Sequence, residues 1–244
     1  MPSLVGSEMC IRDSTNVKLA FFEDRKFIVT KLIEPVFEEF KSVLENYPRV
    51  ESILVSDVRG IDWSFLNSIF DSKEIYILDS SWKFPFKINY ESLETLGPDR
   101  LGLMGAASKL YHKQNVLVVD VGSCITYDLL TQENVYEGGI ISPGYKMRYK
   151  SLKEFTGKLP LIEHNSIESS FGKDTQSSIQ VGVFQGLFYE IQGQIDHFRE
   201  KYTDLTIILT GGDCEQLSKR LKNPIFAHPN FLVEGLDYIL EFNK

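Results

Sequence analysis

Four consecutive residues, Gly97-Pro98-Asp99-Arg100, bring together side chains that suit the phosphorylation of an alcohol. That reaction needs a base beside the attacking hydroxyl, and a carboxylate at a helix start, such as Asp99, can orient and accept the proton. Arg100 offers a planar fork of donors that fits a carboxylate on the acceptor molecule. An ordinary helix start, with Asp99 as its cap and Arg100 on the surface, would look the same. The residues by themselves leave both interpretations open.

Two other segments, 116–126 and 205–213, each place small residues and an aspartate at the end of an apolar run. In the first, Asp120 is followed by Gly122 and Ser123; the second ends in Gly211-Gly212-Asp213. Small residues let backbone N–H groups approach a phosphate, and the acid can hold a cation or order water around one. The simpler alternative for the first segment is a strand that ends in a capped turn.

Alternating strands and helices are expected to position these residues. Apolar runs indicate strands, of which 52–57 and 74–79 are typical of parallel strands whose carboxyl ends carry polar residues, and amphipathic segments indicate helices between them. The expected strands are 17–22, 26–30, 52–57, 74–79, 115–122, 125–130 and 205–210, and the expected helices are 35–47, 62–70, 99–113, 178–202, 214–222 and 232–242.

Composition excludes several classes of protein. The chain has 244 residues, 43% of them hydrophobic, which is typical of a globular protein with a sizeable core. Its net charge of −8 argues against a nucleic-acid footprint, which needs clustered Lys and Arg. No apolar run approaches the roughly 20 residues of a membrane helix, so we expect neither a nucleic-acid nor a membrane partner. Three cysteines without ligand spacing and a start unlike a signal peptide lead us to expect a cytoplasmic location.

Three stretches resemble the type III pantothenate kinases. They are YESLETLGPDRLGLMGAA at 90–107, VVDVGSCITYD at 118–128, and a third region formed by 138–162 with 172–186. Their order and spacing match that family throughout. The resemblance implies an α/β protein with two actin-like (ribonuclease H-like) domains facing across a nucleotide cleft. We expect the domains to be residues 1–110 and 111–244.

The resemblance also implies the roles of the acceptor residues. Asp99 would be the general base, while Tyr90 and Gly97 to Arg100, Pro98 included, would hold pantothenate. Thr175 matches a substrate-contacting Thr, although a lone Thr at a helix start is usually just a cap. A homodimer is implied as well, in which Thr175 completes the site across the interface.

For the nucleotide, the resemblance implies ATP with Mg²⁺ and a monovalent cation, K⁺ or NH₄⁺. Asp120 would help to bind the monovalent cation, and Gly122 with Ser123 would contact the ATP phosphates. Gly211 and Gly212 would approach the adenosine.

The start of the chain departs from the family, which opens with a strand ending in Asp-x-Gly-Asn-Thr-x-x-Lys. Aligned on Lys18, only Thr15 and Lys18 of that phosphate-binding motif remain, and the leading Asp falls on Ile11. Because the preceding residues mix polar and charged types, we expect no buried first strand there. Residues 1–14 are therefore interpreted as foreign sequence, and the chain as written is expected to be weakly active or inactive, and less stable than a family member.

Two alternatives stay open. A non-catalytic regulator on the same fold would bind nucleotide or pantothenate without turnover. A sugar-kinase-like enzyme would keep the fold and change the acceptor, but the arrangement of Tyr90 and Gly97–Arg100 speaks against it.

Overall fold

The chain forms two compact units in the computed structural model, which describes residues 7–13, 17–34, 37–48, 50–58, 60–69, 74–162, 169–212, 214–218, 220–221 and 225–244. The first unit contains Met1–His112, Asn134–Tyr136 and Asn230–Lys244, and the second contains Lys113–Glu133 and Glu137–Pro229. The first expected domain ended at residue 110, close to the end of this first stretch. The C-terminal segment, expected in the second domain, lies in the first unit instead.

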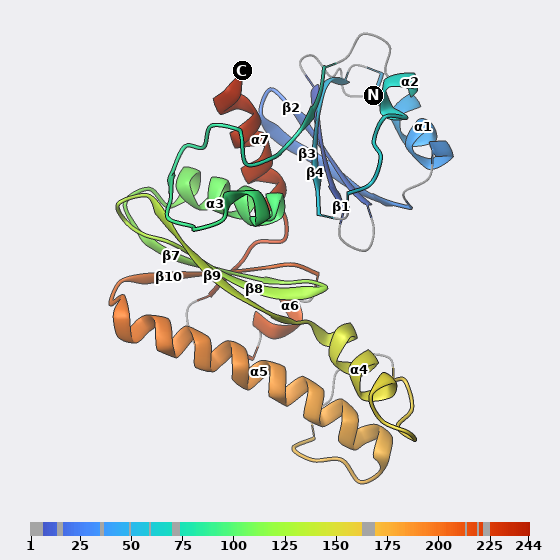
Figure 1. Cartoon of the computed structure of the whole chain (residues 1–244), viewed down its shortest axis with the longest axis vertical. Coiled ribbons are helices and arrows are strands. Elements are labelled where there is room, and N and C mark those ends of the chain that lie inside the picture. The colour runs from blue at the N-terminus through green and yellow to red at the C-terminus, as the bar shows by residue number, and fades with distance from the viewer. Residues whose placement is uncertain are drawn as a thin grey trace. The chain divides into compact units, whose positions relative to one another are not determined.

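A five-stranded sheet forms the centre of the first unit, in the order β3-β2-β1-β4-β5 (Figure 1). The neighbours β1 and β4 are parallel, as are β4 and β5, whereas β2 pairs antiparallel with β1 and with β3. The strands are β1 (Ser7–Asp13), β2 (Val17–Glu23), β3 (Lys26–Ile33), β4 (Val50–Asp57) and β5 (Glu74–Ile77).

Helices cover both faces of this sheet (Figure 1). The short helices α1 (Phe37–Glu45) and α2 (Leu66–Ile69) pack on one face over a core that includes Phe21, Phe40 and Trp63. Helices α3 (Pro98–Leu110) and α7 (Phe231–Asn243) pack against each other and against the strands on the other face. The single 3₁₀ turn in the described part of the chain, η1, spans Leu93–Thr95.

The first strand, β1, is a correction to the sequence analysis. We expected no strand before residue 15, yet Ser7–Asp13 lies in the middle of the sheet, paired with β2 on one side and β4 on the other. The expectation weighed side-chain composition alone. A strand with a neighbour on each side is held by main-chain hydrogen bonds, which do not depend on residue type.

The second unit is built on strands β11-β10-β7-β8-β9, where β10 is parallel to both β7 and β11, and β7 forms an antiparallel hairpin with β8. The first residues of β9 belong to the first unit, where they pair with β6 (Lys87–Ile88). The other strands are β7 (Asn115–Val121), β8 (Cys124–Leu130), β9 (Val135–Pro143), β10 (Leu205–Thr210) and β11 (Ile225–Ala227).

The long helix α5 (Thr175–Lys201) runs along one face of this second sheet, with α4 (Tyr145–Glu154) and α6 (Cys214–Ser218) (Figure 1). Its start is capped by Asp174, which accepts a hydrogen bond from the Ser177 backbone N–H, while Ser177 caps in return. Apolar side chains of α5, among them Leu187 and Ile191, pack on buried strand residues of β7, β8 and β10. None of the helices in the described ranges is long and apolar enough to span a membrane.

Candidate functional site

The start of α3 presents the predicted acceptor residues. Gly97 is the N-cap residue and Pro98 the first helical residue, where proline's missing N–H costs no hydrogen bond. Asp99 follows in the first turn, where the helix dipole favours an anion. Its Oδ1 accepts a hydrogen bond from the Arg100 backbone N–H at 2.8 Å. The carboxylate is therefore directed along the helix start and is only partly buried.

The Asp99 carboxylate occupies the space where a side chain at position 97 would lie. A Cβ atom on Gly97 would lie 2.5 Å from Asp99 Oδ1, well inside ordinary van der Waals contact. The backbone of Gly97 is extended, with φ −61° and ψ 135°, so its backbone angles are open to any residue. A Cβ at this position would therefore displace the Asp99 carboxylate without straining the backbone.

The Arg100 side chain lies against two tyrosine rings and is only 5% exposed. Its Nη1 donates to the Tyr90 hydroxyl at 3.5 Å, and its Cζ lies 5.6 Å from the Tyr90 ring centre and 5.8 Å from that of Tyr136. The two rings are nearly parallel, with centres 6.3 Å apart. Such contacts hold the flat guanidinium in one orientation. The structure thus places Tyr90 next to the segment Gly97-Pro98-Asp99-Arg100.

Sequence reasoning missed Tyr136. It reaches this site because β6 pairs with the start of β9, with Ile88 opposite Tyr136, and the Asn89 N–H donates to the Tyr136 carbonyl at 2.9 Å. The residue lies outside all the strands that the sequence predicts and stands beside the glycine-rich stretch 137–144, so no local pattern pointed to it.

Close packing of α3 on α7 fixes the helix that carries these residues. The two helices meet at Gly102 and Gly235, where a Cβ on Gly235 would lie 1.8 Å from the Gly102 carbonyl oxygen. An ion pair at 3.8 Å joins Lys109 to the buried Asp237. The helix start therefore rests on a rigid contact between backbones.

In the second unit, the hairpin between β7 and β8 carries the predicted phosphate residues. Asp120 is 4% exposed near the end of β7, and the turn that follows contains Gly122 and Ser123. The Gly122 N–H donates to the Cys124 carbonyl at 3.0 Å and closes the turn. Ser123 is exposed.

Two further glycine-bearing loops meet this hairpin. Gly211, just after β10, has φ +94°, and a Cβ there would lie 2.3 Å from the Val121 carbonyl and 2.5 Å from Asp120 Oδ1. Gly144, between β9 and α4, donates its N–H to the Ser123 carbonyl at 3.1 Å. Small residues thus let three backbones approach one another beside a buried carboxylate, an arrangement that can bind phosphate or a cation through main-chain groups.

Four predicted residues remain: Gly212, Lys18, Thr15 and Thr175. Gly212 is exposed next to Gly211, and Lys18 lies in β2. Thr15 falls outside the described residues. Thr175 is the first residue of α5, and it lines an open cavity of about 710 Å³ with Arg148, Ser151, Leu152, Leu159, Ser178, Ile179, Gly182 and Val183. The described residues contain no group of three His, Cys, Asp or Glu side chains arranged to hold a metal ion.

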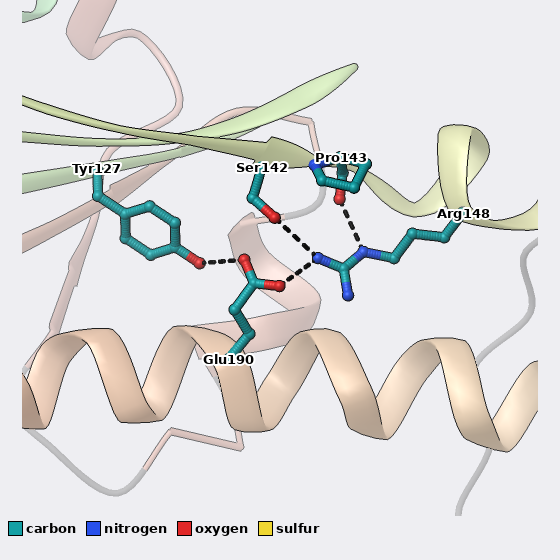
Figure 2. Close-up of polar contacts among 5 residues, drawn as sticks. All are labelled: Tyr127, Ser142, Pro143, Arg148 and Glu190. Carbon is teal, nitrogen blue, oxygen red and sulfur yellow. Dashed lines mark hydrogen bonds and ion pairs between the residues drawn. The ribbon is translucent and has the colours of Figure 1, made fainter. Parts of the chain in front are cut away.

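A polar network that the sequence did not predict links β8, α4 and α5 (Figure 2). The Tyr127 hydroxyl donates to Glu190 Oε1 at 3.0 Å, and Arg148 Nη2 forms an ion pair with Glu190 Oε2. Arg148 also donates from Nε to the Pro143 carbonyl at 2.7 Å and from Nη2 to Ser142 Oγ at 3.1 Å. One guanidinium therefore joins a helix, a second helix and the end of a strand.

The network shifts the pKa of two of its members. Partial burial by itself would raise the pKa of Glu190, but hydrogen bonds from Arg148 and Ser142, together with the Arg148 charge, hold it below its ordinary value. Burial and the adjacent Glu190 carboxylate raise the pKa of the Tyr127 hydroxyl, so this group stays a hydrogen-bond donor.

Comparison with known proteins places the chain in a family. The family model of type III pantothenate kinases matches residues 14–197. A type III pantothenate kinase of Christiangramia forsetii is 42% identical over 233 residues, which are 95% of this chain and 96% of the relative.

Solved structures share the fold at low sequence identity. A Campylobacter jejuni protein described as a Baf-family transcriptional activator gives a TM-score of 0.58 at 20% identity, covering 96% of this chain and 98% of its own. The Lmo2764 protein of Listeria monocytogenes, described as an N-acetylmannosamine kinase, gives 0.55 at 12% identity, covering 98% and 100%. The predicted actin-like α/β fold is thereby confirmed. With 42% identity across nearly its whole length and a family match over residues 14–197, the chain belongs to the type III pantothenate kinases.

Proposed function

We propose that the chain transfers the terminal phosphoryl group of ATP to the 4′-hydroxyl of pantothenate, giving 4′-phosphopantothenate and ADP in the first step of coenzyme A biosynthesis. The proposal rests on the start of α3 in a member of this family, where the Asp99 carboxylate is adjacent to Arg100, whose guanidinium is held by two tyrosine rings. The family match favours this kinase over the non-catalytic regulator and over a sugar acceptor.

In the proposed reaction, Asp99 accepts the proton of the pantothenate hydroxyl as that oxygen attacks phosphorus. A general base in position contributes about 10²–10⁴-fold to such a rate. Arg100, held by the rings of Tyr90 and Tyr136, binds and orients the substrate together with the backbone of Gly97 and Pro98. Because α3 is fixed by its packing on α7, the side chains of Asp99 and Arg100 keep their positions relative to each other.

The hairpin and glycine loops of the second unit are proposed to bind ATP. The amides around Gly122 and the Ser123 hydroxyl would contact its phosphates, and the loop at Gly211 and Gly212 would approach the adenosine. Thr15 and Lys18 are the proposed remainder of the first phosphate-binding motif.

Two cations are part of the proposal. Mg²⁺ supplies neutralisation of phosphate charge when it is bound with ATP. For the monovalent cation, K⁺ or NH₄⁺, the site is at Asp120. Oxygen donors fit a hard cation, and both Asp120 Oδ1 and the Val121 carbonyl lie within 2.5 Å of the Cβ position of Gly211, so these oxygens converge.

A cytoplasmic homodimer is the proposed form of the enzyme. Helix α5 exposes Gly182, Gly186 and Gly193 together with the large side chain of Tyr189. Small residues along a helix permit close approach of a second helix, so this surface supports a dimer contact. Thr175 at the start of the same helix is proposed to complete the acceptor site of the partner subunit.

The altered start is proposed to impair the enzyme. Although β1 supplies a strand to the sheet, Ile11 stands where the family has the aspartate of its first phosphate-binding motif. Loss of that carboxylate removes part of the metal–phosphate electrostatics on which phosphoryl transfer depends.

The test compares two chains in a coupled kinase assay with pantothenate, ATP, Mg²⁺ and K⁺. One chain has the present sequence, and the other has an apolar strand ending in Asp-x-Gly-Asn-Thr aligned on Lys18, called the restored-start chain below. We expect turnover in the restored-start chain and loss of about 10²–10⁴-fold in kcat on Asp99→Asn. Undiminished turnover in the Asp99→Asn variant would refute the assigned base.

A further inference from the structure

We propose that Arg148, held by Glu190, is a positioning residue for the nucleotide site: it fixes the Pro143-Gly144 turn against the Gly122-Ser123 hairpin. This inference rests on the proposed function, in which that hairpin contacts the phosphates of ATP. All six residues lie within the second unit.

The Pro143-Gly144 turn contacts the Gly122-Ser123 hairpin through backbone atoms. The Gly144 N–H donates to the Ser123 carbonyl at 3.1 Å. A Cβ on Gly144 would lie 2.4 Å from the Gly122 carbonyl oxygen and 2.6 Å from that of Ser123. Backbone therefore lies on backbone, and any shift of the turn must move the hairpin.

The turn is held by Arg148. Arg148 Nε donates to the Pro143 carbonyl at 2.7 Å, and Nη2 donates to Ser142 Oγ at 3.1 Å, so the guanidinium grips the two residues before Gly144 (Figure 2). The two donor nitrogens, Nε and Nη2, are fixed relative to each other in the guanidinium plane, which a lysine ammonium cannot reproduce.

Arg148 is held in turn by Glu190. Its Nη2 pairs with Glu190 Oε2, while Glu190 Oε1 accepts from Tyr127 on β8. Tyr127 lies opposite Val119 in the β7–β8 hairpin, the same hairpin whose turn contains Gly122 and Ser123. The network therefore connects β8 and the end of β9 to α5, and hydrogen bonds that involve charged groups are the stronger kind.

The experiment uses the full chain and three variants. Arg148→Met removes the donors, Arg148→Lys keeps the charge without the fork, and Lys150→Met makes the same charge change at an exposed position of α4. Amide hydrogen exchange is followed in peptides covering 121–125 and 142–146. The dissociation constants of ATP and of pantothenate are measured by calorimetry.

We expect Arg148→Met to speed exchange in both peptides by roughly tenfold, as loss of a charge-assisted hydrogen bond does to a local opening equilibrium. ATP affinity should fall by a similar factor while pantothenate affinity falls much less, because the proposed acceptor residues at the start of α3 lie in the first unit and only Thr175, in the cavity that Arg148 also lines, lies in the second. Arg148→Lys should fall between, and Lys150→Met should match the unaltered chain.

Unchanged exchange in Arg148→Met would overturn the inference, and so would faster exchange with unchanged ATP affinity. A general loss of structure would instead speed exchange along all of the chain and weaken both ligands, in Arg148→Lys as well, which also counts against a positioning role. Failure of the proposed function has a different signature: the restored-start chain would bind ATP and form no 4′-phosphopantothenate.

Discussion

Substitution of Gly97 by alanine should damage catalysis with little damage to stability. The Cβ would lie 2.5 Å from Asp99 Oδ1, and ordinary contact begins at 3.4 Å, so the carboxylate must move by 3.4 − 2.5 = 0.9 Å, or the backbone must give. The moving group is the end of a side chain, and the backbone of Gly97 is extended and allowed for alanine. We therefore expect the free energy of unfolding to change by no more than about 1 kcal/mol.

Catalysis is more sensitive than stability to such a shift. Misplacement of a reacting group by about 1 Å can cost 10²-fold in rate. We expect kcat/KM for pantothenate to fall by roughly that factor when Gly97→Ala is introduced into the restored-start chain. The assay is steady-state turnover, with unfolding by urea measured on the same samples.

Gly157→Ala is the matched control. Gly157 is exposed after α4, and an added Cβ meets no atom within 4 Å, so neither turnover nor stability should change. Should Gly97→Ala keep full turnover while its stability is unaltered, the assignment of Asp99 as the base would be refuted. A loss of stability as large as the loss of transition-state binding would show instead that the substitution damages the helix start.

Three further predictions concern packing and charge. Gly211 has a left-handed φ of +94° and backbone atoms close to its Cβ position, so Gly211→Ala should lower the free energy of unfolding in urea by about 2–4 kcal/mol. Gly212 has open space around it, so Gly212→Ala should change this free energy by no more than about 0.5 kcal/mol, and equal effects of the two substitutions would contradict the prediction. Gly235→Ala should destabilise by about 2–3 kcal/mol because α3 and α7 must separate, and thermal unfolding that is unchanged would refute the close contact. Because the pKa of Glu190 is lowered in the fold, its charged form stabilises the fold at pH values above the ordinary pKa of 4.5, and this stabilisation is lost as the pH falls below 4.5. The difference in free energy of unfolding between the unaltered chain and Glu190→Gln should therefore narrow from about pH 6 to about pH 3.5, and a constant difference would show that the charge contributes nothing.

The local parts of the acceptor site could be predicted from sequence because they depend on adjacent residues. Proline at the first helical position followed by an acid marks the start of α3, and the helix begins at Pro98. In the same way, an apolar strand that ends in Asp120 and Gly122 marks the hairpin. Their roles, in contrast, came from the resemblance to the family.

The long-range parts could not be predicted. Glu190 lies 42 residues from Arg148 and 63 from Tyr127, and no spacing or periodicity connects them. Strand β9 is absent from the strands that the sequence predicts, because Gly138 and Gly139 suggest turns, although Gly138 fits inside the strand with φ +92°. The placement of β1 also depended on its neighbours, since two flanking strands supply the hydrogen bonds that its own composition did not suggest.

Helix α7 shows a similar limit. Its sequence predicted an amphipathic helix over 232–242, and the structure has one over Phe231–Asn243. The sequence did not show that this helix packs on α3, more than a hundred residues earlier, through Gly102 and Gly235. Glycine in a helix is unfavourable for local structure, and here close backbone packing is the reason for it.

The central claim is tested most directly by 4′-phosphopantothenate formation in the present and restored-start chains, measured with ATP, Mg²⁺ and K⁺. We predict weak or absent turnover in the present chain, clear turnover in the restored-start chain, and loss of that turnover on Asp99→Asn. Product formation by the present chain at the rate of an intact relative would contradict the proposed defect at Ile11. If neither chain formed 4′-phosphopantothenate while pantothenate still bound, the result would contradict the proposed kinase activity and favour a non-catalytic binding protein.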